Sequence, residues 1–415
     1  MTSEIKQRIE QIRRGEVPER YVKTALGLAP TDWKRYTFGD IYTERKEPGD
    51  ENLPLLMVSI HSGVSDGEVD AAELPKQVKR IEDKSQYKKA VSGDLVFNMM
   101  RAWQGAIGTV RTTGMVSPAY IVAEPNDKAY PLFMDYYSRT PQMINQIDRQ
   151  SYGVTDFRKR LYWDSFAPIS CTLPPIEEQQ KIAAILTTQD KVIELKEKCL
   201  AEKQRQKKYL MQQLLTGKKR LPGFNGAWKT DCLGKLFFER KETNCENIEM
   251  LAITGTQGII PRKELDLKDN SSEDKSKYLR VCVGDIGYNT MRMWQGVSAY
   301  SNYEGIVSPA YTILKPSSSI NAKYFAYLFK MSEIVFLFYR FSQGLVDDTR
   351  NLKYENFKKI KVCYPPDMKE QTAIAKVLSA ADREINLLRQ DIEQEKQKKK
   401  ALMQLLLTGI VRVKT

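Results

Sequence analysis

The sequence predicts an α+β protein in which two homologous copies of one module are joined by two long antiparallel coiled-coil helices, as a pseudo-twofold internal repeat. Three observations lead to this fold class. The sequence contains two copies of one module, separated by a nearly constant shift. The first part of each copy has the short apolar runs that are typical of a mixed sheet. The second part has the long heptad pattern of a helix.

The internal repeat extends over almost the whole chain. Trp33-Lys34 returns as Trp228-Lys229, 195 positions later, and Met100-Arg101 returns as Met291-Arg292, 191 positions later. The other matching blocks are Glu44-Arg45-Lys46-Glu47 with Glu239-Arg240-Lys241-Glu242, Gly93-Asp94 with Gly284-Asp285, Val116-Ser117-Pro118-Ala119-Tyr120 with Val307-Ser308-Pro309-Ala310-Tyr311, and Glu178-Gln179 with Glu370-Gln371. Because the shift drifts by only a few residues, we infer one duplicated module with small loop insertions.

The first part of each copy predicts mixed sheet with some helix. Short apolar or aromatic runs, such as 55–60, 94–98 and 119–122, stand between clusters of glycine, proline, serine and asparagine. Runs of this length between turn residues are typical of strands.

The second part of each copy predicts a long helix. Residues 176–216 and 367–408 contain neither glycine nor proline, and each stretch is closed by a glycine, Gly217 or Gly409, at the position of a C-terminal cap. Apolar residues recur at heptad spacing, which favours a coiled coil, although the first seam has a polar middle of Gln189, Lys196, Lys203 and Lys207. Because a whole module separates the two helices in the sequence, the chain between them is long enough for the helices to pair antiparallel. The 33 residues from Ile182 to Leu214 would span roughly 50 Å, or about 15 base pairs of duplex DNA.

These patterns divide the chain into seven parts. They are an N-terminal extension (1–30), module 1 (31–175), a first spacer helix (176–217), a linker (218–227), module 2 (228–366), a second spacer helix (367–409) and a tail (410–415).

The charge balance favours an anionic polymer as partner, although a merely soluble basic protein explains the charge alone equally well. The chain has 415 residues, and 65 lysines and arginines against 52 aspartates and glutamates give a net charge of +13. The six cysteines form no CxxC pair and His61 is the sole histidine, so we expect neither a zinc site nor a disulfide framework. No secretory pattern or membrane-spanning apolar run is present, and we therefore expect a cytoplasmic protein that contacts no membrane.

The duplicated motifs resemble those of the specificity subunits of type I restriction-modification enzymes. The resemblance runs from Trp33 to Gly409 and rests on the Asn-x-Met-Arg-x-Trp-Gln-Gly blocks at 98–105 and 289–296, the Val-Ser-Pro-Ala-Tyr blocks, and the Pro-Pro entry and Leu-Leu-Thr-Gly exit of each long helix. It implies that each module is a target-recognition domain that reads one half of a bipartite, interrupted site in double-stranded DNA. It also implies that the helices set the gap and dock two methyltransferase subunits, to which restriction-translocase subunits add.

The same resemblance implies that this chain is not itself an enzyme and binds no cofactor. S-adenosylmethionine, ATP and Mg²⁺ would be held by the partner subunits. The residues themselves agree, since Leu173-Pro174-Pro175 and Tyr364-Pro365-Pro366 lack the polar first residue of an amino-methyltransferase motif, and no GxxxxGK[ST] loop is present. We interpret both Pro-Pro pairs as strand-to-helix corners. The nuclease-like triplets at 82–84 and 273–275 are interpreted as solvated loops.

Four residues of the duplicated blocks have the chemistry of base readers. Arg101 and Arg292 could each donate two hydrogen bonds to the edge of a guanine, and Gln104 and Gln295 could each form two with the edge of an adenine. However, residues that are identical in both modules cannot distinguish two different half-sites, so framework or phosphate contact is an equal alternative for these four. For Trp103, Trp294, Met100 and Met291, framework or phosphate contact is favoured over base readout.

Base readout is expected in the loops that differ between the modules, namely 76–89 against 261–277 and 151–160 against 342–350. The basic residues of these loops can neutralise phosphates, which gives affinity without sequence information. They are Lys79, Arg80, Lys88, Lys89, Arg158, Lys159, Arg160, Arg262, Lys263, Lys277 and Arg350.

The predicted helices also carry apolar residues outside the seam. Ile185, Val192, Val377 and Leu387 are candidates for docking a partner helix. Two other classes of function stay open, a self-contained methyltransferase or nuclease with tandem recognition domains, and a coiled-coil scaffold without a role on DNA.

Overall fold

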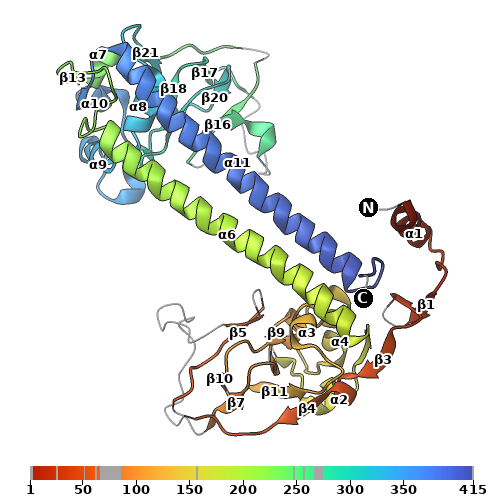
Figure 1. Ribbon diagram of the computed structural model, residues 1–415. Coiled ribbons are helices and arrows are strands. Elements are labelled where there is room, and N and C mark those ends of the chain that lie inside the picture. The colour runs from red at the N-terminus through yellow and green to blue at the C-terminus, as the bar shows by residue number, and fades with distance from the viewer. Residues whose placement is uncertain are drawn as a thin grey trace. The chain divides into compact units, whose positions relative to one another are not determined.

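The chain forms two compact units that each contain one module. The computed structural model describes residues 3–24, 27–50, 52–60, 63–65, 86–155, 158–245, 248–255, 258–265 and 274–413. Unit 1 comprises Met1–Leu195 together with Ile392–Thr415, and unit 2 comprises Lys196–Asp391 (Figure 1).

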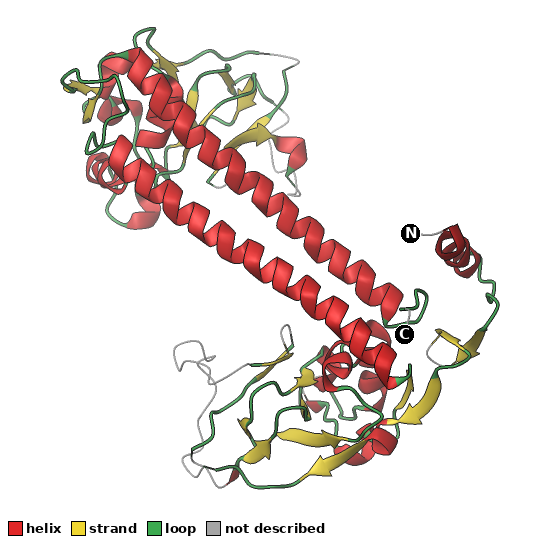
Figure 2. Cartoon of the chain, in the orientation of Figure 1, coloured by secondary structure: helices red, strands yellow, loops and turns green. Residues whose placement is uncertain are grey.

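Module 1 is built around a four-stranded antiparallel sheet in the order β4-β11-β8-β9. Figure 2 draws the strands in yellow and the helices in red. A second, two-stranded sheet pairs β3 with β12, so the beginning of the module meets its end. The elements are β3 (Lys34–Thr37), α2 (Phe38–Ile41), β4 (Tyr42–Arg45), β5 (Val58–Ser59), β6 (Gly63–Val64), β7 (Lys88–Ala90), β8 (Leu95–Asn98), η2 (Ala102–Gln104), β9 (Ile107–Thr109), β10 (Gly114–Val116), β11 (Tyr120–Pro125), α3 (Pro131–Tyr137), α4 (Pro141–Gln150), α5 (Trp163–Phe166) and β12 (Ser170–Leu173).

Module 2 repeats this topology strand for strand. Its four-stranded sheet has the order β14-β21-β18-β19, and β13 pairs with β22. The elements are β13 (Lys229–Cys232), α7 (Leu233–Leu236), β14 (Phe237–Arg240), β15 (Leu251–Thr254), β16 (Gly258–Pro261), η4 (Arg262–Glu264), β17 (Leu279–Val281), β18 (Ile286–Asn289), η5 (Met293–Gln295), β19 (Ser298–Tyr300), β20 (Gly305–Val307), β21 (Tyr311–Pro316), α8 (Ala322–Leu328), α9 (Ser332–Phe341), η6 (Asp347–Thr349), α10 (Tyr354–Phe357) and β22 (Lys361–Tyr364). The duplication that the sequence predicts is therefore a duplication of structure.

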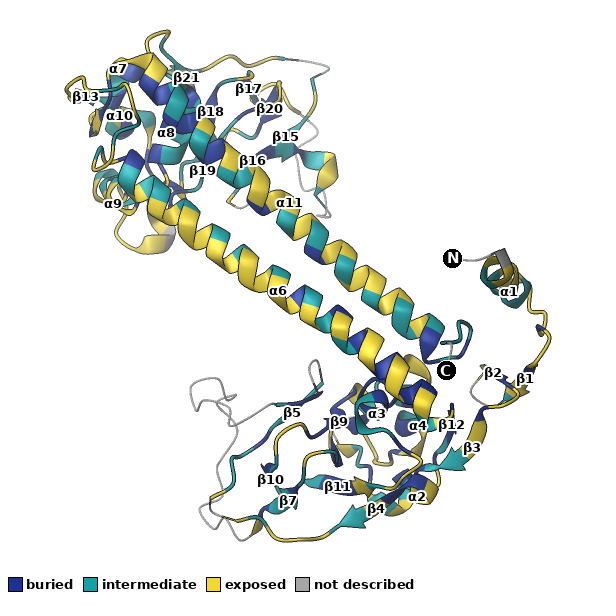
Figure 3. Cartoon of the chain, in the orientation of Figure 1, coloured by how far each residue is buried: buried dark blue, intermediate teal, exposed yellow. Residues whose placement is uncertain are grey.

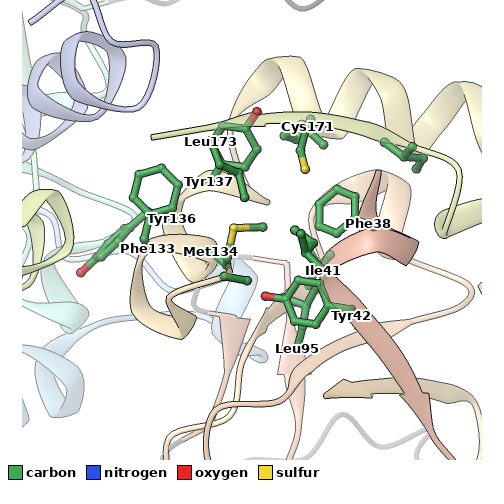
Figure 4. Packing of buried hydrophobic residues seen from close by; sticks show 14 of the residues in the cluster. Phe38, Ile41, Tyr42, Leu95, Phe133, Met134, Tyr136, Tyr137, Cys171 and Leu173 are labelled. Atoms are coloured by element: carbon green, nitrogen blue, oxygen red, sulfur yellow. The ribbon is translucent and has the colours of Figure 1, made fainter. Parts of the chain in front are cut away.

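The strands divide each module between two cores, because successive side chains of a strand point to opposite faces of the sheet. Leu95 and Phe97 of β8 join the larger core, whereas Val96 between them joins a smaller one on the other face. In the larger core of unit 1, Phe38 and Tyr42 pack with Met134 (Figure 4). The same core contains Ile182 of the first long helix and Leu407, which directly follows the second. Figure 3 colours the buried residues dark blue. Unit 2 has the corresponding core.

Each long helix begins at the Pro-Pro corner that the sequence predicts. Strand β12 ends at Leu173 and α6 spans Ile176–Leu214, while β22 ends at Tyr364 and α11 spans Met368–Leu406. Gly217 and Gly409 follow the two helices, both with a φ of +71°. A side chain at Gly409 would lie 2.6 Å from Pro30 and 3.0 Å from Trp33, so both the left-handed backbone and the close approach require glycine.

Within each unit, segments of α6 and α11 run antiparallel and pair their polar seam residues. In unit 1, Gln189 donates to Glu395 at 2.6 Å. In unit 2, Lys196 pairs with Asp391 at 2.8 Å, and Lys203 with Glu384 at 2.6 Å. The polar residues that weaken an apolar seam therefore find partners on the other helix.

A matched polar cluster attaches each module to the helices. The hydroxyl of Tyr136 donates to Asp190, which Lys399 also pairs with. In unit 2, Tyr327 donates to Asp382 in the same way, and Lys207 is the cation. These clusters join one module helix to both long helices within each unit.

The N-terminal extension contacts the C-terminal tail within unit 1. It contains α1 (Ser3–Arg13), β1 (Tyr21–Thr24) and β2 (Gly27–Pro30). The hydroxyl of Tyr21 donates to the carbonyl of Gly409 at 2.6 Å, and Arg8 donates to that of Ile410 at 3.1 Å. In the part of the chain that is described, no helix has the length and apolar character needed to cross a membrane.

A buried carboxylate anchors the start of each long helix. Glu178 is fully buried and is bound by Arg412, with both oxygens at 2.8 Å from the guanidinium. Glu370 is bound in the same way by Arg220, at 2.6 and 2.7 Å. Removing one partner of such a pair leaves a charge buried without compensation.

We expect Arg412→Gln to destabilise unit 1 by about 3 kcal/mol, the lower end of the cost for a buried pair because this guanidinium is partly exposed. Hydrogen exchange in low urea, followed by mass spectrometry, should show faster exchange in peptides of unit 1 alone. Arg220→Gln should give the reverse pattern. Lys398→Gln, which removes an exposed pair, is the control and should cost less than about 0.5 kcal/mol. Equal protection in all three variants would contradict the anchoring role.

Candidate nucleic-acid interface

The Asn-x-Met-Arg-x-Trp-Gln-Gly block of module 1 forms a tight turn between β8 and β9. The side chain of Asn98 accepts a hydrogen bond from the amide of Met100 at 2.9 Å, and the indole of Trp103 donates to the carbonyl of Met100 at 3.0 Å. Gly105 closes the turn with a φ of +103°. Between these fixed points, Arg101 and Gln104 are exposed.

The same turn recurs in module 2 with the same bonds. Asn289 accepts from Met291 at 2.9 Å, Trp294 donates to the carbonyl of Met291 at 2.9 Å, and Gly296 has a φ of +79°. Arg292 and Gln295 are exposed. Each module thus presents one arginine and one glutamine from an identical, internally bonded turn.

Most other residues of the repeated motifs have a structural role. Arg45 binds buried Asp94 at 2.8 Å, and Arg240 binds buried Asp285 at the same distance. Gln179 donates to the carbonyls of Pro174 and Lys128 and accepts from the amide of Tyr130. These contacts explain why both copies carry the same residues.

Arg101, Gln104, Arg292 and Gln295 differ from these framework residues. None of the four side chains makes a hydrogen bond or ion pair with another described residue. The fold therefore does not account for their presence in both modules, whereas the indole bonds of Trp103 and Trp294 agree with the framework role expected for the tryptophans.

A short hairpin stands beside each turn. Tyr152 and Arg160 close the first by mutual backbone bonds of 3.1 and 2.9 Å, and Gln343 and Asn351 close the second. We name these segments, 151–160 and 342–351, the reading hairpins. The base of each is tied to its turn, since the amide of Leu161 donates to Met99 and that of Leu352 to Thr290.

The described residues of the two hairpins are matched in backbone and different in side chains, and residues 156 and 157 lie outside the described part of the chain. A side chain on Gly344 would lie 2.7 Å from the backbone of Thr349, so the two legs approach closely, and Gly153 is equally crowded by Arg158. The tips carry apolar residues that are almost fully exposed, Val154 at 91% and Leu345 at 101%. Matched geometry with unmatched side chains is suited to reading two different ligands of one kind.

The surroundings of the repeated tryptophan also differ. In module 1, the Lys159 ammonium lies 5.0 Å from the Trp103 ring centre and pairs with Asp148 at 2.8 Å. In module 2, Tyr339 lies edge-on to Trp294, and Arg350 stacks 4.0 Å above Tyr339. Sequence reasoning missed Asp148 and Tyr339, although the 191-residue shift places them at one position.

The remaining basic candidates lie in varied settings. Lys88 donates to the carbonyl of Tyr120 at 2.8 Å, and its burial lowers the pKa of the ammonium. Lys89 and Lys263 are paired with Glu47 and Glu249. Arg158 and Lys277 are exposed, Arg160 donates to the carbonyl of Lys159, and Arg262 lies half-buried in η4. Lys79, Arg80 and His61 lie outside the described residues.

Two of the four candidates for partner docking are clearly accessible. Ile185 is 37% exposed and Leu387 is 65% exposed, whereas Val192 and Val377 are half-buried. Val377 packs against the core of unit 2. Leu195, which is 64% exposed, is a further apolar residue on α6 that the sequence pattern did not single out.

The residues that superficially resemble catalytic motifs lie in ordinary positions. Both Pro-Pro pairs stand between a strand and a long helix, as interpreted. Asp274 and Lys275 are exposed, and the triplet at 82–84 lies outside the described residues. Among the residues that the structure describes, no three histidine, cysteine or acidic side chains are grouped so that they could hold a metal ion.

Comparison with known proteins places these two modules in one family. The family described as "Type I restriction modification DNA specificity domain" matches residues 71–205 and 234–397, which together make up most of the chain. Two proteins of Methanocaldococcus jannaschii, named as the MjaX and MjaVIII type I restriction enzyme specificity subunits, are each 24% identical to this chain. The alignments cover 96% and 95% of this chain and 98% and 97% of the relatives.

Solved structures share the fold at low identity. The S subunit of a type I restriction-modification system from M. genitalium is 12% identical, with a TM-score of 0.56 over 92% of this chain and 97% of that one. A chain from work on complex assembly and conformational transition of the type I R-M system is 17% identical, with a TM-score of 0.52 over 92% and 99%. With both of its modules matched, this chain belongs to the type I restriction-modification DNA specificity family.

Proposed function

We propose that this chain is the DNA sequence-specificity subunit of a type I restriction-modification complex. Each module, with the boundaries 31–175 and 228–366, reads one half of a bipartite, interrupted duplex site. The observation that carries this proposal is the matched pair of turns and hairpins, which present identical free side chains beside different ones. Family membership and relatives named as specificity subunits support it.

The shared and the variable residues have different parts in this proposal. Arg101, Gln104, Arg292 and Gln295 hold each module on the duplex through phosphates or sugars, since such contacts position a protein without reading sequence. The reading hairpins supply the base contacts in the major groove, where each base pair presents its own pattern of donors and acceptors. Arg158, whose side chain is exposed, neutralises a phosphate next to the first hairpin, whereas Lys159 and Arg350 already pair with Asp148 and Asp347.

The long helices would act as a coiled-coil spacer that fixes the gap between the half-sites. Their polar seam pairs support this role, because ion pairs across a seam specify register and orientation. The exposed Ile185 and Leu387 would contribute to docking two methyltransferase subunits, and restriction-translocase subunits would add to these. S-adenosylmethionine, ATP and Mg²⁺ would then belong to the partners, and this chain would be a non-catalytic subunit that acts in the cytoplasm.

The test of this function is to map the methylated adenines. We expect a strain that expresses this chain with its cognate methyltransferase to methylate a split motif, two short specified blocks around a fixed unspecified gap, as read by single-molecule sequencing. Replacing residues 31–175 by the matching module of a relative should change one block only. A contiguous motif, or methylation that persists without this chain, would overturn the proposal. Purified chain with DNA, S-adenosylmethionine and Mg²⁺ should be inactive, and activity would favour the self-contained enzyme.

Exchange of the reading hairpins tests the division between shared and variable residues. Segments 151–160 and 342–351 have the same length and the same closing bridge, so putting the second in place of the first should preserve the fold. We expect this chimera to change the bases specified in one block of the methylated motif and to leave the gap and the other block unaltered.

Arg101→Ala with Gln104→Ala is the matched variant of the same module. Because both side chains are exposed and unbonded, stability should change by less than about 0.5 kcal/mol. DNA affinity should fall for any sequence, and the slope of log affinity against log salt should decrease by about 0.9 for each phosphate that is no longer neutralised. A changed motif in this variant would instead make these residues base readers.

A further inference from the structure

Unit 2 contains a groove of about 740 Å³ between module 2 and its two long-helix segments. Helix α8 and the loop after it supply one wall, and α6 and α11 supply the other. The charged residues that line it are Lys207, Lys323, Lys330, Asp382, Arg383 and Arg389. Five of these six are cations.

Asp382 is the single carboxylate among the described residues that line the groove, and it is already engaged. Asp382 accepts from the hydroxyl of Tyr327 at 2.6 Å and pairs with Lys207. The ammonium of Lys330 donates to the carbonyls of Gly296 and Ser298 at 2.7 and 2.6 Å. Burial, with a smaller effect of the neighbouring Lys207, lowers the pKa of Lys330 to about 8.

Arg383 and Arg389 have no structural role that accounts for them. Both are exposed on α11, and neither makes a hydrogen bond or ion pair with a described residue. Lys323 contacts only the ring of Tyr300 among the described residues, at 5.6 Å. Three cations of the groove are therefore available to an anionic ligand.

The repeat shows that this charge is not part of the shared framework. Five lining positions of unit 2, Lys323, Ala326, Arg383, Asn386 and Arg389, carry a net charge of +3. The corresponding positions, found from shifts of 191 and 192 residues, are Leu132, Asp135, Lys191 and Glu194 in unit 1 and Glu197 two residues beyond its boundary, with a net charge of −2. Asp135 is buried and paired with Arg139. The exposed helix positions alone, Arg383, Asn386 and Arg389 against Lys191, Glu194 and Glu197, still differ by three charges, which favours different ligands at the two surfaces.

The groove is continuous with the turn of module 2. Lys330 bonds the carbonyl of Gly296, the residue directly after Gln295, and Ser298 to Tyr300 line the groove. A duplex held by Arg292 and Gln295 therefore has its backbone within reach of the groove's rim. Phosphates are regularly spaced anions that lysine and arginine bind without regard to sequence.

We propose that this groove binds the phosphate backbone of duplex DNA, and that unit 2 alone makes this contact. The inference rests on the proposed function and adds to it an asymmetry between the units. Arg383 and Arg389 make the contact from α11, and Lys323 makes it from α8.

The test uses the complex with methyltransferase subunits that carries Arg383→Gln and Arg389→Gln. Affinity is measured between 50 and 300 mM salt for one duplex with the methylated motif and one without it. With two fewer phosphates neutralised, the slope of log affinity against log salt should decrease by about 1.8, and both duplexes should bind roughly tenfold or more weakly at 0.1 M salt. The methylated motif should not change. Lys323→Gln should reduce the slope by a further 0.9, approximately.

The matched control is Lys191→Gln, at the position in unit 1 that corresponds to Arg383. We expect its salt dependence to equal that of the unsubstituted complex. An unaltered slope in the unit 2 variant, or dissociation of methyltransferase from the complex by native mass spectrometry, would overturn the proposal, and the second outcome would assign the groove to an acidic protein surface. The motif of the unsubstituted complex tests the proposed function separately, so the two can fail independently.

Discussion

The fold depends on a buried carboxylate at the start of each long helix. Glu178 and Glu370 are almost completely removed from solvent, and an ion in that position persists only when a partner compensates the missing hydration. The compensating arginine, Arg412 or Arg220, follows the end of the other long helix. Each pair therefore joins the beginning of one helix to the end of the other within one unit, a connection that only antiparallel helices can make.

That connection explains residues of the repeat that otherwise look like a family signature. Asp32 adds a second carboxylate to Arg412 at 2.7 Å, and the guanidinium lowers the pKa of Asp32. Trp33 packs against Gly409, and Trp228 packs against Gly217. The Trp-Lys block, the Glu-Gln block and the closing glycine are thus parts of one junction, and it occurs twice.

The sequence was sufficient for the features that depend on local periodicity. The two long helices, their glycine ends, the Pro-Pro corners and the doubled module follow from spacing and turn chemistry, and the structure has each of them. The pairing of Gln189, Lys196 and Lys203 with acids on α11 did not follow, because register between two helices is a tertiary property. From sequence alone the polar middle counts against an apolar seam, whereas in the structure it is a set of matched contacts.

The candidate site also contains some residues that the sequence identifies and others that only the structure identifies. The exposed arginines and glutamines could be named from the motif, but only the structure separates them from Asn98 and Trp103, which share the motif and are used by the turn. Lys88 has the charge of a phosphate ligand, yet its ammonium is held by the Tyr120 carbonyl. Arg383 and Arg389 were missed for the opposite reason, since on a helix rich in charge they resemble any solvated face.

A duplicated chain offers an internal control that a single module lacks. Arg45 and Arg240 occur in both copies and each binds a buried aspartate, so their contribution to stability is enough to explain why both copies have them. Where both keep a residue that the fold does not use, as with Arg101 and Arg292, a shared ligand is the simpler cause. Where the copies differ on a common backbone, as in the reading hairpins and the groove of unit 2, the difference favours different ligands for the two units. Two unlike half-sites on one asymmetric duplex would impose these differences.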